Sequence, residues 1–393
     1  MNVNMGKIMK NTLILAGVLS MFAISAHAQS SVTLYGSLDA GVVYANNAGG
    51  HPAWNQGSGA LSDTYFGLKG SEDLGGGLHA IFRLENGFNL NNGKDTEAGT
   101  MFNRQAYVGL QSNQYGALTL GRQYDSMVDY VAPLSDAGSG FGNNLAAHPF
   151  DNDNLDHSFS IRNSVKYQSA SYAGVKFGGL YGFSNDAGQF ANNRAWSVGA
   201  SYGAGPLNVA AAYLQMNNSR TNSNANGANS AGAGNNVNLS AETQRTFGAG
   251  LNYTYGPATA GFVWTHTQYE NLIAGGQGGN TFSIPSGMNL HLDNFELNGR
   301  YALTPALALD ASYTFTDGKV KGSNGSGDPK WHTVSLQADY AFSKRTDVYV
   351  QGVYQHASGE LGELGQNVAM INTLSPSTTP NQVAATVGLR HRF

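Results

Sequence analysis

Hydrophobic and polar residues alternate one by one at both ends of the chain. Residues 32–44 read VTLYGSLDAGVVY, in which Val, Leu and Ala mostly occupy one face and Thr, Tyr, Ser and Asp the other. At the end of the chain Val387 and Leu389 alternate with Arg390 and Arg392. A period of two over such lengths predicts tilted strands long enough to cross a membrane, with one face toward lipid and the other toward water.

The connections between the alternating stretches are of two kinds. Seven are short turns, at 72–78, 113–117, 170–174, 203–206, 255–258, 303–306 and 343–347. Eight are longer and polar, at 46–63, 86–102, 125–160, 184–194, 216–244, 269–291, 317–330 and 355–381. Short and long connections alternate along the chain. This asymmetry is typical of outer-membrane barrels, which have short turns on one side and long loops on the other.

Fifteen connections join sixteen strands, so the sequence predicts an all-β fold, a 16-stranded antiparallel transmembrane β-barrel. The barrel must close, because an open edge in lipid leaves N–H and C=O groups unpaired at a cost of several kcal/mol each. A soluble β-sandwich and a secreted β-solenoid are the alternatives. A sandwich rarely holds sixteen strands in one domain, and the chain shows no fixed-period repeat.

The start of the chain has the features of an export signal. Lys7 and Lys10 precede an apolar run at 12–24, and Ala-His-Ala follows at 26–28. A signal peptidase needs such small residues, and the apolar run is short for a membrane span of about 20 residues. We therefore predict a signal peptide at 1–28 and a single barrel domain at 29–393.

Composition narrows the function further. The 393-residue chain has no cysteine, so an exported protein of this size needs another stabilising device, most simply an extensive hydrogen-bond network. The formal net charge is −4, and it becomes about −6 once Lys7 and Lys10 leave with the signal peptide. This acidic balance, without a basic cluster, argues against a nucleic-acid partner.

Several segments resemble the trimeric general porins of Gram-negative bacteria, in their β-proteobacterial branch. These are SSVTLYGSLDAGVVY (30–44), FGLKGSEDLGGGLHAIFRLENGF (66–88), FNRQAYVGLQSNQYGALTLGRQYD (102–125), NSVKYQS (163–169), FSKRTDVYVQGVY (342–354) and VGLRHRF (387–393). They extend from the first strand of the mature chain to its last residue.

The resemblance implies a homotrimer in the outer membrane that lets small hydrophilic solutes and ions diffuse passively through a water-filled lumen. It also implies that the third external loop folds into the barrel and narrows it. Outer-membrane lipid and lipopolysaccharide would surround the trimer. The terminal Phe393 resembles the signal that the barrel-assembly machinery recognises. We predict no cofactor, no catalytic residue and no dedicated metal site, and we leave open whether the loop carboxylates bind divalent cations opportunistically.

The third long connection, 125–160, is the longest of the eight, and fixed charges on it and on the wall would set ion preference. Its acidic candidates are Asp125, Asp129, Asp151 and Asp153, with Asp136 and Asp156 in the same connection. By motif match to the family, the candidates on the facing wall are Arg104, Arg122, Arg162 and Lys166. The alternative is that these cations lie at a membrane interface or a subunit contact.

Strict alternation does not by itself turn the arginines inward. It places Arg104 on the face of Val108 and Leu110, and it places Arg122 on the face of two leucines. A bulge at a glycine or a position near the strand end would re-aim either side chain. The chain also departs from the family at Tyr65, where relatives often carry an arginine before GLKG. The loss of this wall cation leaves the ion preference open.

The stretch DNDNLDH (151–157) suggests a metal loop or a catalytic group. The calcium-binding EF-hand template fails, because Leu155, Asp156 and Arg162 stand where it needs a ligand, a glycine and a glutamate. His148 and His157 without any cysteine make a poor zinc site. An outer-membrane hydrolase using Asp and His, a substrate-specific channel and an adhesin are the alternative functions. We predict a general diffusion porin, with these carboxylates facing the pore.

Overall fold

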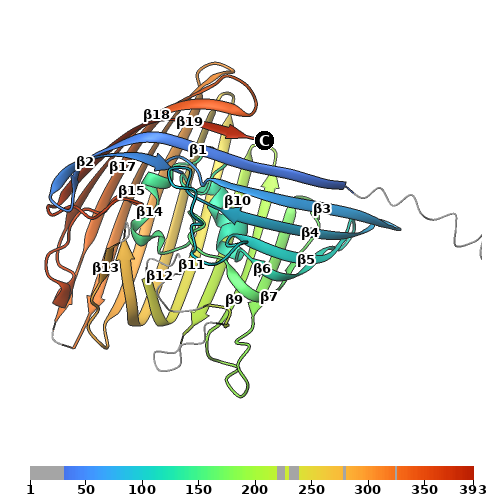
Figure 1. Cartoon of the computed structure of the whole chain (residues 1–393), viewed down its shortest axis with the longest axis horizontal. Helices are drawn as coiled ribbons and strands as arrows, with labels where there is room; N and C mark the ends of the chain where they lie inside the picture. Colours follow the sequence, from blue (N-terminus) through green and yellow to red (C-terminus); the bar gives the residue numbers. More distant parts are fainter. Residues whose placement is uncertain (1–30, 219–225, 230–238, 278–279, 324) are drawn as a thin grey trace, which may run out of the picture.

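The computed structural model describes residues 31–218, 226–229, 239–277, 280–323 and 325–393. Sixteen strands within these ranges form the wall of one antiparallel β-barrel, drawn in Figure 1. The barrel closes where β1 (Ser31–Ala48) pairs with β19 (Asn381–Arg392), from Ser37 opposite Arg392 to Ala45 opposite Ala384. The predicted fold is confirmed. The predicted signal peptide, 1–28, lies outside the described residues.

Neighbouring wall strands are joined in sequence order, and each pairs antiparallel with the next. Between β1 and β19 the wall strands are β3 (Tyr65–Gly75), β4 (Leu78–Gly87), β5 (Gln105–Ser112), β6 (Gly116–Gln123), β7 (Ile161–Gln168), β8 (Val175–Gly182), β9 (Arg194–Ala204), β10 (Leu207–Asn217), β11 (Leu239–Tyr255), β12 (Ala258–Gln277), β14 (Asn289–Ala302), β15 (Leu307–Lys321), β17 (Lys330–Ala341) and β18 (Thr346–Ser358). Three short strands extend the long-connection side: β2 (His51–Ser58), β13 (Asn280–Phe282) and β16 (Ser326–Gly327).

All seven predicted short turns join consecutive wall strands. Several predicted long connections are in part strands. Residues 46–63 contain a β1–β2 hairpin that turns at Gly49 and Gly50, both with positive φ, and the rings of Tyr44 and Trp54 lie 4.8 Å apart across it. Residues 269–291 begin with the end of β12. Paired strands satisfy each other's backbone groups, so they can continue beyond the apolar belt even where their side chains are polar.

The two faces of the wall differ as the alternation predicts. On β15, Leu309 and Tyr313 are exposed, whereas Asp310, Ser312 and Thr314 are buried. The exposed apolar side chains face outward, where a membrane barrel meets lipid. The polar side chains face the inside of the barrel. Tyr255, Tyr301 and Tyr340 are exposed near the short turns, as expected for an interfacial aromatic girdle.

The segment 125–160 packs against the inner, polar face of the wall. It contains four short helical turns, η1 (Met127–Val131), η2 (Ala132–Leu134), η3 (Asn144–Ala146) and η4 (Pro149–Asp151). Figure 1 draws its coils within the ring of strands. An apolar cluster ties η1 and η2 to β10, with Met127 and Val131 against Leu214. No helix among the described residues is long and apolar enough to cross a membrane.

Candidate functional site

A histidine bridge attaches the segment 125–160 to the wall. His148 is buried, with Nδ1 2.6 Å from Asp153 Oδ2 and Nε2 3.0 Å from Glu296 Oε2 on β14. Burial alone would lower the pKa of His148, but the charges and hydrogen bonds of Asp153 and Glu296 outweigh it and raise that pKa well above its ordinary value. The imidazolium therefore lies between two carboxylates. Thr265 on β12 also donates to Asp153, at 2.5 Å.

The stretch 151–157 is a buried turn and not a metal loop. Asp151 accepts hydrogen bonds from the backbone N–H groups of Asp156 (3.0 Å) and Ser158 (3.2 Å). Asp151, Asn154 and His157 have positive φ, so the chain turns tightly here. Burial and the charge of Asp153 raise the pKa of Asp151 to about 7. The carbonyl of Asn152 accepts hydrogen bonds from wall side chains, namely Gln244, Thr267 and Tyr269.

The predicted pore-facing positions of Asp151 and Asp153 differ from what the structure shows. Their exposed fractions are 3% and 0%. Sequence reasoning treated these carboxylates as free charges, but their oxygens are occupied by the turn itself, by His148 and by the wall. Their role is to hold the segment in place.

The start of the segment is fixed in a similar way. Asp125 is fully buried, and it accepts hydrogen bonds from the Met127 N–H and the Asn154 amide, both at 2.7 Å. Burial raises the pKa of Asp125 to about 6. Asp125 therefore caps the segment and does not face open space as predicted. Asp129 forms an ion pair with Lys166 on β7 at 2.5 Å, and Lys166 also donates to the Tyr124 carbonyl. The structure thus brings Asp129 and Lys166 together.

The middle of the segment reaches the opposite end of the sheet. Asn143 donates to Ser335 on β17 at 2.6 Å, and Asp136 accepts from Ser312 on β15 at 2.5 Å. Arg390 on β19 donates to the Phe141 carbonyl at 2.6 Å. The Arg300 guanidinium lies 3.6 Å from the centre of the Phe141 ring. The segment is therefore anchored along β11 to β19.

Arg104 lies just before β5, so strand alternation does not determine its direction. Its side chain forms ion pairs with Asp63 and with Glu85 on β4, where Nε lies 2.8 Å from Oε1. Its guanidinium lies 4.7 Å from the centre of the Tyr65 ring. Tyr65 thus provides a stacking surface for Arg104.

Arg122 and Arg162 are held by one carboxylate that the sequence did not single out. Glu97, in the connection between β4 and β5, forms ion pairs with both, and its Oε2 lies 2.6 Å from Arg122 Nη2. The pairing of β6 with β7 shifts register between Gly121 and Gln123, where Gly121 has a φ of 141°. The backbone irregularity that would turn the Arg122 side chain away from the face set by strict alternation is therefore present. Whether either arginine lines the pore stays a prediction.

Three cations on β3 to β8 that sequence reasoning did not select have no acceptor among the described residues. Lys69 on β3, Arg83 on β4 and Lys176 on β8 make no hydrogen bond or ion pair with any described residue. Lys69 and Arg83 are cross-strand partners beside Tyr35, with Lys69 Nζ 5.0 Å from the ring centre. Alternation could have identified them, because Lys69 follows outward-facing Leu68 and Arg83 precedes Leu84.

The inner face of the barrel is covered unevenly. On β12 to β18 the inward side chains under the segment are buried, among them Thr265, Asn294, Glu296, Thr316 and Ser335. On β3 to β8, Lys69 and Lys176 are exposed and Arg83 is half-buried. The open side of the lumen therefore carries three cations without an acceptor in the described ranges. Arg300 on β14 also makes no ion pair with a described residue, but its guanidinium lies against the Phe141 ring of the segment.

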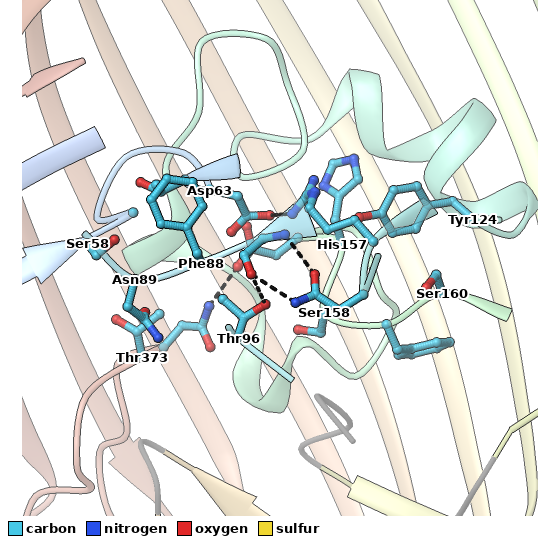
Figure 2. A pocket seen from close by; sticks show the side chains of 18 residues that line it. Ser58, Asp63, Phe88, Asn89, Thr96, Tyr124, His157, Ser158, Ser160 and Thr373 are labelled. Atoms are coloured by element: carbon cyan, nitrogen blue, oxygen red, sulfur yellow. Dashed lines mark hydrogen bonds and ion pairs between the residues drawn. The ribbon is translucent and has the colours of Figure 1, made fainter. Parts of the chain in front are cut away.

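A cavity of about 250 Å³ lies on the long-connection side of the segment, shown in Figure 2. Asp63, Thr96 and His157 come from three different connections and face one space, together with Ser158 beside His157. Burial and the nearby Arg104 lower the pKa of His157 to about 4, so this ring is neutral at pH 7. The lining combines Arg104 and its partner Asp63 with Asp156, His157, hydroxyls and amides.

The described residues contain no group of three His, Cys, Asp or Glu side chains arranged to hold a metal ion. The Asp and His side chains of 151–157 are engaged in the turn and its contacts with the wall. A closed barrel with an apolar exterior, a polar and partly open interior and an internal segment defines a membrane channel.

Comparisons with known proteins place this channel in a family. A model described as Gram-negative porin matches residues 15–360. An outer membrane porin protein of Bordetella pertussis is 33% identical, with 98% of this chain and 100% of that protein aligned. Outer membrane porin protein 32 of Delftia acidovorans is 26% identical at the same coverage. A solved anion-selective porin from Comamonas acidovorans superposes with a TM-score of 0.69 at 22% identity, covering 93% of this chain and 100% of its own.

The chain belongs to the Gram-negative porin family. It is an outer-membrane general diffusion porin, which lets small hydrophilic solutes and ions cross passively, and it is not an enzyme.

Proposed function

We propose that residues 125–160 set the size limit of this porin and that unpaired cations on the uncovered wall give it a weak anion preference. The uneven covering of the inner face carries this proposal. The segment occupies the β11–β19 side, so solutes pass along β3 to β8. There they meet Lys69, Arg83 and Lys176, which form no ion pair with any described side chain.

The cations predicted from sequence contribute less to this preference. Arg104 is balanced by Asp63 and Glu85, and Lys166 is balanced by Asp129. Arg122 and Arg162 share Glu97. An ion-paired guanidinium presents little net charge to a passing ion. The name of the Comamonas acidovorans porin, an anion-selective one, agrees with the sign we propose.

We also propose that the porin works as a homotrimer surrounded by outer-membrane lipid and lipopolysaccharide. A structural relative, OmpT of Vibrio cholerae, has been solved in a trimer form and superposes with a TM-score of 0.60 at 18% identity. We assign Phe393 to recognition by the barrel-assembly machinery. Its backbone N–H and carbonyl pair with those of Gly36, both at 3.1 Å, so the end of the chain sits at the barrel seam.

Conductance in a planar bilayer tests these proposals. We expect ohmic currents that close in three equal steps, and a reversal potential on the anion side in a KCl gradient. Lys69→Gln is expected to move the reversal potential toward cations, because it removes an unpaired lumen charge. Lys319→Gln is the matched control, because Lys319 is an exposed lysine on the outward face of β15. A cation-side potential in the native channel, or equal shifts in both variants, would contradict the proposed charge selection.

A further inference from the structure

A second cavity lies on the other side of the segment, between η1 and the short turns. Its volume is about 610 Å³. It extends from the middle of the wall, at Arg83 and Gln123, to the turns that follow β5 and β7. Asp129 and Lys166 lie where the segment meets the wall strand β7. This cavity does not share lining residues with the cavity of Figure 2.

The charges around this cavity are unbalanced. Three cations line it, Arg83, Lys166 and Lys176, and Asp129 is the one carboxylate among the lining side chains. Asp129 is committed to Lys166 at 2.5 Å. The remaining two positive charges, on Arg83 and Lys176, face a concave space with no acceptor among the described residues. Such a space attracts anions, because its low-dielectric walls strengthen the field of the unpaired cations.

Neutral hydrogen-bond donors complete the lining. The phenol of Tyr107 and the amides of Gln111 and Gln168 make no hydrogen bond to any side chain or backbone group in the described ranges. Tyr107 is the cross-strand partner of Arg83, so its ring stands beside the guanidinium. An Arg guanidinium matches two oxygens of one carboxylate or phosphate. Amide and phenol donors can bind the remaining oxygens.

We propose that this cavity is an oxyanion-binding site, which holds a small solute with carboxylate or phosphate groups during its passage. Arg83 on β4 and Lys176 on β8 would bind charged oxygens at opposite ends of the cavity, and Tyr107, Gln111 and Gln168 would donate to the others. The inference rests on the proposed open path along β3 to β8. It adds that the path contains a binding step, located on the short-turn side of the segment.

Current block in a planar bilayer tests the site with two probes, citrate and inorganic phosphate. In KCl at pH 7, each probe is expected to reduce the current in a saturable way, and more strongly from one side of the membrane. Sucrose at the same concentration is the neutral control. Block by either probe supports the site and identifies which oxyanion it accepts. Absence of block by both probes overturns the proposal, while continued KCl conductance shows that the channel itself is intact.

Variants locate the block at this cavity. Arg83→Gln and Lys176→Gln are each expected to weaken the block about tenfold, because each removes a charged hydrogen-bond donor. Arg83→Lys keeps the charge but loses the two-pronged geometry, so an intermediate loss is expected. Lys319→Gln, on the outward face, is expected to leave the block unchanged. An equal weakening by Lys319→Gln, or none by Arg83→Gln and Lys176→Gln, overturns the assignment.

Discussion

Replacing His148 with alanine is expected to weaken the attachment of the internal segment to β14 and to destabilise the barrel. Asp153 and Glu296 would then face each other as buried carboxylates without a cation between them. Removing one partner of a buried charge cluster typically costs about 3–5 kcal/mol. We expect a lower unfolding midpoint in denaturant and noisier open-channel currents.

A triple variant separates charge from packing at this bridge. His148→Gln, Asp153→Asn and Glu296→Gln together leave the shape similar but remove all three charges. Replacing a whole buried ion cluster with neutral groups is often tolerated. Most of the lost stability should therefore return in the triple variant. If the triple variant is as unstable as His148→Ala, packing and not charge holds the segment.

The same bridge predicts how the segment responds to pH. The pKa of His148 is raised, so its ion pairs stabilise the fold fully below its ordinary pKa and are lost as pH rises through the raised value. Asp151 adds to this direction. Its pKa of about 7 means that the folded chain favours the protonated carboxyl, so stability falls as pH rises from about 4 to 7. The contribution of these groups to the free energy of unfolding should therefore be larger at pH 5 than at alkaline pH.

Replacing Arg390 with methionine is expected to have the second large effect. Arg390 is 2% exposed and forms ion pairs with Asp347 at 3.0 Å and Asp339 at 3.3 Å. Its guanidinium also donates a hydrogen bond to the Phe141 carbonyl. In the variant, Asp339 and Asp347 remain buried without Arg390, and Asp347 retains only its ion pair with Arg392. We expect a loss of about 3–5 kcal/mol, measured by denaturant unfolding of the barrel in micelles.

Arg245→Met is the matched control for this measurement. Arg245 on β11 pairs with Glu270 on β12, and both side chains are about one-third to one-half exposed. An exposed pair contributes about 0–1 kcal/mol. If the two variants lose equal stability, the burial of Arg390 is not what makes its ion pairs important.

The sequence carried enough information for the barrel but not for the internal contacts. Alternation and turns placed the sixteen strands, because each strand must separate lipid from water by itself. The sequence predicts a loop where the structure has the β1–β2 hairpin, although the Gly49-Gly50 pair is a hairpin signal. Alternation is weak on the β2 arm, because its sequence HPAWNQGS is mostly polar or small and most of its side chains are exposed.

The charged residues show where sequence reasoning stops. Asp153 contacts His148, which is only five residues away, but it also accepts a hydrogen bond from Thr265 on a distant strand. The second partner of His148 is Glu296, 148 positions further along the chain. No local pattern encodes such partners. Motif matching selected Arg104, Arg122 and Arg162, which the structure pairs with carboxylates. Lys69 and Arg83 had the right parity, but only the three-dimensional contacts show that they are unpaired.

Single cysteines test most directly that solutes pass along β3 to β8 and not along the covered wall. The chain has no natural cysteine, so each introduced thiol is unique. Lys69→Cys places a thiol on the open side, and Thr316→Cys places one at a position that is fully buried under the segment. We expect a cationic methanethiosulfonate reagent to change the current through the Lys69→Cys channel and to leave the Thr316→Cys channel unaffected. Rapid modification at Thr316→Cys with none at Lys69→Cys would contradict the account.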